Sequence, residues 1–319
     1  MTNEKSSYTH HIGIDVSKYT LEVGFPVTRT TTTFDNNKDG WRQMWKEMRK
    51  SLQNALVVVE TTGWYERGVL HYLAGKNVAV HRASARQVKQ FIASYGTLAK
   101  TDAIDARALA QYAKERAETL VCYDVPDKKQ EELQILYARY FDLKKMMVQE
   151  KNRLQAPGYK NMAGSVQRII NALDEQANIM ISQIREIIEH DANLYKKYET
   201  LRTVDGIGEI TAFALLASMP ELGRLNRKQA ASLAGLAPHP KDSGRKTGYR
   251  KTRGGRVGIR EVVNMAALGA VRKKHSKLKH FYDRLIQDNN KKPMVALTAV
   301  KRKLIVIANA RLAELDVMI

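Results

Sequence analysis

Cysteine is almost absent from the 319-residue chain, which contains only Cys122. A single cysteine excludes an internal disulfide and any zinc site built on paired cysteines. No apolar run approaches the roughly 20 residues needed to span a bilayer, and the polar residues 1–11 lack the apolar stretch of a signal peptide. We therefore expect a cytoplasmic protein that does not enter a membrane, with Cys122 as an ordinary core or surface residue.

Acidic residues are also scarce relative to basic ones. The chain has 33 Asp and Glu against 53 Lys and Arg, which gives a formal net charge of +20. Residues 239–303 contain 19 Lys and Arg but four acids, and so carry most of this excess. A solvated helix face normally mixes the two signs, and a field of this sign attracts polyanions. The segment is predicted to bind nucleic acid.

The first third of the chain has the pattern of an α/β domain, which we place at residues 1–125. Three strands, a helix, a strand, a helix, a strand and further helices follow in the order of a ribonuclease-H-like fold. Thr101 is the expected N-cap of the last helix. The expected strands are 11–16, 21–25, 30–34, 56–59 and 78–80, and the expected helices are 39–52, 64–74, 84–92 and 101–116.

Apolar residues at heptad spacing recur on both sides of Pro157-Gly158. This pattern predicts a helical coiled-coil hairpin over residues 126–195, either folded on itself or paired between subunits, and an ordinary helical bundle is the alternative. Residues 196–319 are predicted to form a mainly α-helical C-terminal domain.

Four acids stand where the predicted strands end or a helix begins. Asp15 ends the first strand and Glu60 follows the buried run 56–59, while Asp102 and Asp105 share one face of a helix. Four converging carboxylates would repel one another without a cation. Two Mg²⁺ ions would neutralise them and could clamp the attacking and leaving oxygens of a phosphodiester, although each acid taken alone fits a solvated surface equally well.

Two features of the C-terminal region fit phosphate binding. Gly206 and Gly208 form a turn that opens a helix, as in helix-hairpin-helix contacts with DNA, although a plain helix corner would look the same. Further along, Ser243 lies among cations that can hold a phosphate and favour a serine alkoxide. The cations assigned to nucleic-acid binding are Lys241, Arg245, Lys246, Arg250, Lys251, Arg253, Arg256 and Arg260.

Several blocks resemble the DEDD transposases of bacterial insertion sequences, a family related to the Piv-type DNA invertases and similar in its N-terminal domain to the RuvC junction resolvase. The three N-terminal blocks are Gly13-Ile14-Asp15-Val16-Ser17-Lys18, Glu60-Thr61-Thr62-Gly63 and Lys100-Thr101-Asp102-Ala103-Ile104-Asp105-Ala106-Arg107. Lys100 and Arg107 flank the acids of the third block and could touch phosphate or lie idle on the surface. The C-terminal blocks are Leu236-Ala237-Pro238, Ser243-Gly244 and Gly258-Ile259-Arg260. The family pattern has leucine where Ile259 stands and a later tyrosine, near Val263-Asn264, that this chain lacks.

The resemblance implies a catalytic mechanism and partners. Asp15, Glu60, Asp102 and Asp105 would be the metal-binding tetrad, and Ser243 would be the nucleophile that becomes joined to DNA. The enzyme would act on DNA, use a structured bridge RNA as its guide, and work as a homodimer or homotetramer. Its reaction would be transposition, with the target site and the direction of strand exchange left open.

Three other functions fit parts of the same sequence. A Piv-type invertase would use the same chemistry on a fixed pair of inverted sites. A metal-only Holliday-junction nuclease would not need Ser243, and a non-catalytic nucleic-acid-binding protein would need neither the serine nor the four acids.

Overall fold

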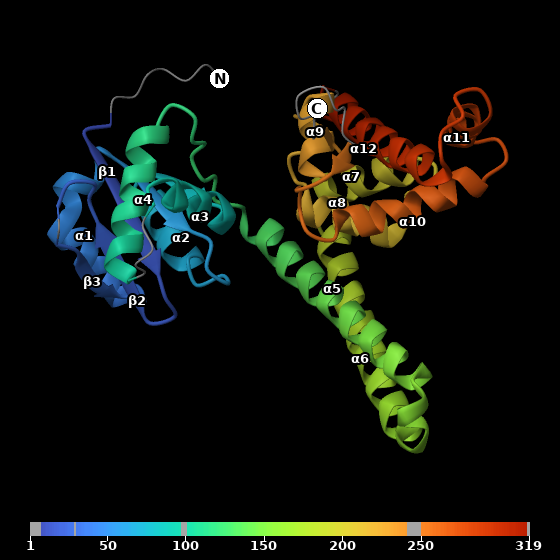
Figure 1. Ribbon diagram of the computed structural model, residues 1–319, viewed down its shortest axis with the longest axis horizontal. Helices are drawn as coiled ribbons and strands as arrows, with labels where there is room; N and C mark the ends of the chain where they lie inside the picture. Colours follow the sequence, from blue (N-terminus) through green and yellow to red (C-terminus); the bar gives the residue numbers. More distant parts are fainter. Residues whose placement is uncertain (1–7, 29, 97–100, 241–249, 318–319) are drawn as a thin grey trace. The chain divides into compact units, whose positions relative to one another are not determined.

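A computed structural model of the chain describes residues 8–28, 30–96, 101–240 and 250–317 (Figure 1). The chain divides into two compact units, which we call the α/β unit (Met1–Pro126) and the helical unit (Asp127–Ile319). No described helix has both the length and the apolar character needed to cross a membrane.

The described residues of the α/β unit form a five-stranded sheet in the order β3-β2-β1-β4-β5. β1 pairs antiparallel with β2 and parallel with β4, and β4 pairs parallel with β5. The strands are β1 (His10–Val16), β2 (Thr20–Gly24), β3 (Thr32–Asp35), β4 (Ala55–Glu60) and β5 (Ala79–Ala83). A mixed sheet followed by a helical region is the predicted fold class, and it is consistent with a ribonuclease-H-like domain.

Helices cover both faces of this sheet, so its central strands are buried on both sides. Apolar residues of α1 and α2 pack on one face, and those of α3 and α4 pack on the other. The helices are α1 (Lys38–Leu52), α2 (Arg67–Ala74), α3 (Ala85–Ser94) and α4 (Asp102–Arg116). The helix predicted from residue 64 begins three residues later, because Gly63 and Trp64 have φ values of 56° and 84°, which an α-helix does not allow.

Two glycines let α4 lie directly on the sheet. Gly13 of β1 pairs with Gly24 of β2. A Cβ atom on Gly13 would come within 2.0 Å of the Ala106 carbonyl oxygen, and one on Gly24 within 3.0 Å of the Arg107 nitrogen. The missing side chains therefore fix how closely α4 approaches β1 and β2.

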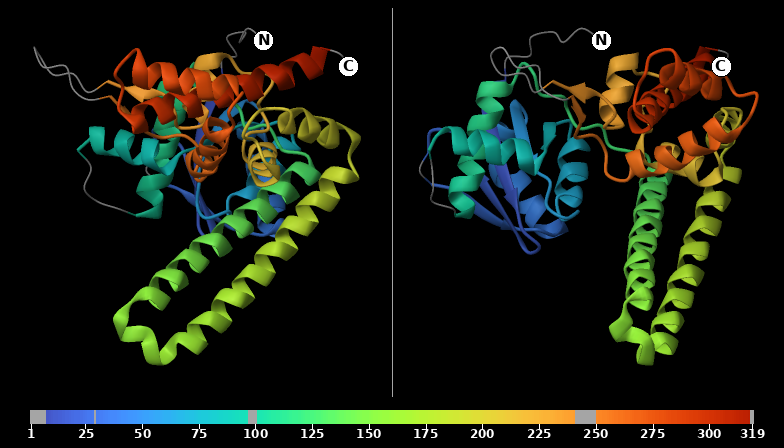
Figure 2. Two further views of the ribbon diagram at one scale, coloured as in Figure 1. Left: turned by 90° about the vertical axis from the view of Figure 1, so that its right-hand side faces the viewer. Right: turned by 45° about the vertical axis from the view of Figure 1, so that its right-hand side comes forward.

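The helical unit is built around α8, which is buried over Thr211–Ala217 and contacts α5, α7 and α10. The long helices α5 and α6 pack against each other as an antiparallel pair, joined by a short 3-10 helix, η1 (Figure 2). Its elements are α5 (Lys128–Gln155), η1 (Pro157–Met162), α6 (Ala163–Glu189), α7 (Ala192–Arg202), α8 (Glu209–Ser218), α9 (Arg227–Leu233), β6 (Pro238–His239), β7 (Lys251–Thr252), α10 (Ile259–Arg272), α11 (Lys277–Gln287) and α12 (Pro293–Val317). A coiled coil between subunits stays a prediction.

Candidate active site

Asp15 and Glu60 lie side by side on neighbouring strands. Ile14 pairs with Val59 in the parallel ladder between β1 and β4, so the next residue of each strand is Asp15 and Glu60. Side chains alternate between the faces of a sheet, and Ile14 and Val59 belong to the core under α1 and α2. Asp15 and Glu60 therefore share the opposite face, on which α4 lies, and both are half-buried.

The start of α4 brings two more carboxylates to this place. Thr101 caps the helix as predicted, its hydroxyl accepting a hydrogen bond of 3.2 Å from the Ile104 nitrogen. Asp102 and Asp105 follow in the first turn of α4. Asp102 precedes the buried Ala106 by four residues, so both lie on the side of the helix that faces the sheet. The Thr101 cap fixes where α4 begins, and the glycine contacts fix how closely it lies on the sheet. Together they position both acids near Asp15.

The charges of these acids act on one another. Burial is the largest cause, followed by the charges of Asp105, Asp102 and Glu60, and together they raise the pKa of Asp15 from 3.8 to about 6. The other three acids thus lie close enough to influence the pKa of Asp15, and their convergence on one metal ion stays a prediction.

The carboxylates could hold a cation, although their arrangement does not itself form a cluster of ligands. Within the described residues, no group of three or more His, Cys, Asp or Glu side chains is gathered closely enough to hold a metal ion. A donor set of carboxylate oxygens is the type that Mg²⁺ prefers.

Glu66, which the sequence analysis missed, fastens the loop that follows Glu60. Its side chain is fully buried and accepts hydrogen bonds from the Thr62 nitrogen at 3.1 Å and from Arg82 Nε and Nη2 at 3.1 and 2.5 Å. Burial acts to raise the pKa of Glu66, but the hydrogen bonds from Arg82 and the backbone outweigh it and leave the pKa lowered. The loop after β4 is therefore tied to β5.

Asn36 is a second positioning residue that the sequence analysis missed. Its side-chain amide donates to the Ser17 carbonyl at 2.9 Å and to the Tyr65 carbonyl at 3.2 Å, and its oxygen accepts from Trp41 Nε1 at 3.1 Å. Ser17 lies two residues beyond Asp15, and Tyr65 ends the loop that begins at Glu60. One side chain thus joins the segments that follow the two strand-end acids.

The helical unit has a basic pocket of about 530 Å³ beside the ribbon of β6 and β7 and the first turns of α12. Three cations line it, of which Arg250 and Lys251 were predicted to bind nucleic acid and Arg302 was not. None of the three forms an ion pair with another residue of the described chain. Its lining residues are Leu236, Pro238, Arg250, Lys251, Thr252, Val295, Thr298, Ala299 and Arg302.

The other predicted cations differ in how they are engaged. Arg256 is half-buried, donates to the Glu221 carboxylate at 2.8 Å and also bonds the Ser218 carbonyl, so the fold itself uses its charge. Arg260 is exposed and donates to the Thr252 carbonyl at 3.1 Å, and Arg253 is exposed. Nucleic-acid binding by these residues stays a prediction.

The two glycines of the predicted phosphate-binding turn have different surroundings. Gly206 has φ +92°, and a Cβ there would lie 2.2 Å from the Ala266 carbonyl oxygen of α10. Gly208 is the N-cap of α8 and has open space around its Cα. Gly206 thus serves close packing, while Gly208 leaves room for a ligand at the helix start.

Four predicted site residues lie outside the described residues. They are Ser243, Lys241, Arg245 and Lys246.

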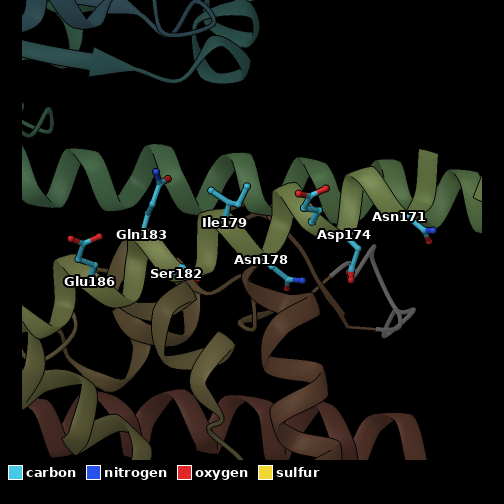
Figure 3. Close-up of a pocket in the computed structure, with 8 residues that line it drawn as sticks. Asn171, Asp174, Asn178, Ile179, Ser182, Gln183 and Glu186 are labelled. Carbon is cyan, nitrogen blue, oxygen red and sulfur yellow. The ribbon is translucent and has the colours of Figure 1, made fainter. Parts of the chain in front are cut away.

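A second hollow, of about 600 Å³, runs along α6 in the helical unit (Figure 3). Its lining includes Asp174, Glu175 and Glu186 and no cation. This charge is the wrong sign for a polyanion, so we assign the hollow no role in nucleic-acid binding.

Fold and carboxylate edge together define a class, the ribonuclease-H-like α/β domains with acids at the carboxyl edge of the central strands. A family model for DEDD transposases of the IS110 type, described as Transposase, matches residues 12–157, and one described as Transposase IS116/IS110/IS902 family matches residues 198–283. No curated protein matches the chain. The chain belongs to the IS110-type DEDD transposases, which confirms the resemblance in its sequence blocks. Such enzymes cut and rejoin DNA, so DNA is its partner.

Proposed function

We propose that the chain is the recombinase of an insertion sequence, in which Asp15, Glu60, Asp102 and Asp105 hold Mg²⁺ and Ser243 is the nucleophile. The observation that carries the metal assignment is the register of β1 and β4, in which Asp15 and Glu60 are neighbours on the sheet face covered by α4, whose first turn contains Asp102 and Asp105. Ionised carboxylates held together at neutral pH favour a cation over an empty edge.

Mg²⁺ bound there would polarise the phosphodiester and stabilise the charge that develops on its oxygens. The Ser243 oxygen would attack the phosphorus and form a serine–phosphate ester, while the departing DNA oxygen takes up a proton. Attack by a DNA hydroxyl on that ester would then release the serine. The bond energy is conserved through both steps, so no ATP is required. Basic residues such as Arg250 and Lys251 would hold the phosphate.

A bridge RNA and a homodimer or homotetramer complete the proposal. The excess of basic residues supports binding of nucleic acid but does not distinguish RNA from DNA. Paired strands must be cut together in recombination, which favours more than one subunit. Purification from cells that carry the native locus, followed by sequencing of the bound nucleic acid, tests the guide. One discrete RNA encoded beside the gene supports it, and heterogeneous RNA or none counts against it.

The catalytic assignment is tested on DNA carrying the ends of the element, with full-length protein and Mg²⁺. We expect Asp15→Asn to slow strand cleavage by about a thousandfold, in the range seen when charge stabilisation at a reacting oxygen is lost. Ser243→Ala should abolish the covalent protein–DNA adduct on a denaturing gel. Asp39→Asn, at an exposed acid of α1, and Ser232→Ala, at an exposed serine of α9, are the matched controls.

Each result separates one part of the proposal from another. Recombination with an adduct in Ser243→Ala would show that another residue is the nucleophile. Cleavage without an adduct in the wild type would indicate a metal-only nuclease. Unchanged cleavage in Asp15→Asn would remove the metal site.

A further inference from the structure

Trp64 stands apart from the other two tryptophans of the chain. Trp41 and Trp45 pack against the core under α1 and α2. Trp64 is 41% exposed, and its neighbour Tyr65 is 47% exposed. An exposed tryptophan beside an exposed tyrosine is unusual on a surface that contacts only water, because both rings leave large apolar areas unburied.

The backbone at Trp64 is held in a conformation that bulky residues avoid. Its φ of 84° lies in the left-handed region, which glycine adopts without strain. The loop does not relax, because Asn36 holds the Tyr65 carbonyl and the buried Glu66 is bound to Arg82. The fold thus maintains a costly conformation that displays an aromatic ring.

A cation already lies on the Trp64 ring. The guanidinium carbon of Arg67 is 3.6 Å from the ring centroid, which is the geometry of a stacked cation–π pair. Arg67 covers one face of the ring and adds positive charge beside it, and the ring still keeps its exposed area. An aromatic ring with a cation beside it suits a nucleobase, which is a flat ring attached to an anionic backbone.

The ring is close to the carboxylate edge along the chain. Trp64 lies four positions after Glu60, so the two Cα atoms can be at most about 14 Å apart. A DNA strand advances about 3.4 Å per nucleotide in a duplex, so this reach spans at most about four nucleotides. A nucleotide within about four positions of a phosphate held at Glu60 is therefore at a distance from which it could contact the ring.

We propose that Trp64, stacked on Arg67, is a platform for a nucleobase of the DNA strand that is cut at the carboxylate edge. This inference rests on the proposed function for the strand's position. Base stacking on an aromatic ring tolerates any sequence, because every base has a flat face. Trp64 would thus position the strand without reading its sequence.

The test uses the full-length protein in Mg²⁺-free buffer with a 20-nucleotide single-stranded DNA that contains 2-aminopurine. Trp64→Gly removes the ring and suits the left-handed backbone, so it should fold at least as well as Trp64→Ala. We expect Trp64→Gly to weaken binding about tenfold and to abolish part of the 2-aminopurine quenching. Trp64→Phe keeps a ring and should restore most of both signals.

A matched control and a salt series separate stacking from other effects. Tyr95 is also an exposed aromatic of the α/β unit, but its hydroxyl bonds Glu115 near the far end of α4, roughly 20 Å along the helix from Asp102. Tyr95→Ala should leave the affinity unchanged. Trp64→Gly should leave the slope of log affinity against log salt unchanged, because a stacking contact releases no counterion.

Unchanged affinity and quenching in a folded Trp64→Gly protein would overturn the proposal, and so would an effect seen with an RNA of the same sequence but not with DNA. Cleavage assays on the same variants distinguish this failure from failure of the proposed function. If Asp15→Asn abolishes cleavage while Trp64→Gly binds and cuts normally, the platform is wrong and the proposed function stands. If the wild type does not cut DNA at all, the proposed function fails and the binding assay still judges Trp64.

Discussion

Acids gather at one edge of the α/β unit, whereas cations that form no ion pair within the described residues gather in one pocket of the helical unit. At the acidic edge, burial and then the neighbouring carboxylates raise the pKa of Asp15 to about 6. In the helical unit, Arg250, Lys251 and Arg302 share a pocket, while other cations such as Arg185 and Lys273 are paired with acids. Like charges held together destabilise a fold until an opposite charge binds. The α/β unit thus has an acidic edge and the helical unit a basic pocket, which suit the metal ions and the phosphate of the proposed function.

The units also differ in what their glycines do. Gly13 lets α4 touch the sheet and so positions Asp102 and Asp105, whereas Gly164 lies in α6 with open space around it. A methyl group at Gly13 would clash with backbone atoms of α4, which can move only if the whole helix shifts. The same methyl at Gly164 meets only the tip of a flexible arginine.

Gly13→Ala should have the largest effect of the substitutions compared between the units. We expect the α/β unit to lose about 3 kcal/mol of stability, because α4 must shift to admit the methyl group. A displacement of the aspartates by about 1 Å should slow cleavage about a hundredfold. Urea denaturation and the cleavage assay measure the two effects. Gly164→Ala, as the control, should stabilise by about 0.5–1 kcal/mol without slowing cleavage, and equal effects of the two substitutions would remove the distinction.

The charge held at Asp15 should appear as a pH dependence of the metal-free protein. A raised pKa means that the folded state binds more protons than the unfolded state between pH 3.8 and about 6. Stability from this group therefore falls as pH rises through that window, and the loss is complete above pH 6. The shift corresponds to about 3 kcal/mol, which we reduce to about 1 kcal/mol because the partly exposed carboxyl is screened by solvent.

Thermal denaturation of the wild type and Asp15→Asn from pH 4 to pH 8 measures this contribution of Asp15 to the free energy of unfolding. Asp15→Asn should lack the decrease in stability that Asp15 causes in the wild type as pH rises. The stability of the variant relative to the wild type should therefore increase up to about pH 6 and then stay constant. Mg²⁺ should stabilise the wild type more at pH 7.5 than at pH 5. A difference that does not vary with pH would show that neither burial nor the neighbouring acids raise the pKa of Asp15.

The smallest expected effect lies in the core of the helical unit. The hydroxyl of Tyr137 is buried and has no hydrogen-bond partner among the described residues, and burial raises its pKa. Tyr137→Phe removes this unpaired polar group and should stabilise the unit by about 1 kcal/mol. Calorimetry checks the value, with Tyr140→Phe at a half-buried hydroxyl as the control. A destabilised Tyr137→Phe protein would mean that the hydroxyl has a partner.

Much of the α/β unit could be predicted from sequence because its signals are local. Apolar runs predicted the strands, and Thr101 was predicted as the helix cap, so the order of elements alone indicated that the acids lie at one edge of the sheet. The bracing residues carry no such signal. Glu66 resembles an ordinary acid near a helix start, and only the fold shows that Arg82, sixteen residues away, neutralises it.

In the helical unit, long-range packing hides more of the site. The basic composition predicted a polyanion surface, but it could not separate Arg256, which is engaged by Glu221, from Arg250, which faces the pocket. Arg302 escaped prediction because it lies on a helix about 50 residues beyond β7 and reaches the pocket only through the fold. For Gly206, the pattern predicted a phosphate turn, which stays a prediction, but it could not show the close contact with α10.

The division of the four acids between sheet and helix has a consequence for motion. Asp15 and Glu60 belong to strands in the middle of the sheet, while Asp102 and Asp105 ride on a single helix. An ion bound by both pairs would link α4 to the sheet. Local unfolding of the first turn of α4 would then be coupled to release of the ion. Amide hydrogen exchange in that turn would then report metal occupancy directly, because the turn would open only when the ion leaves.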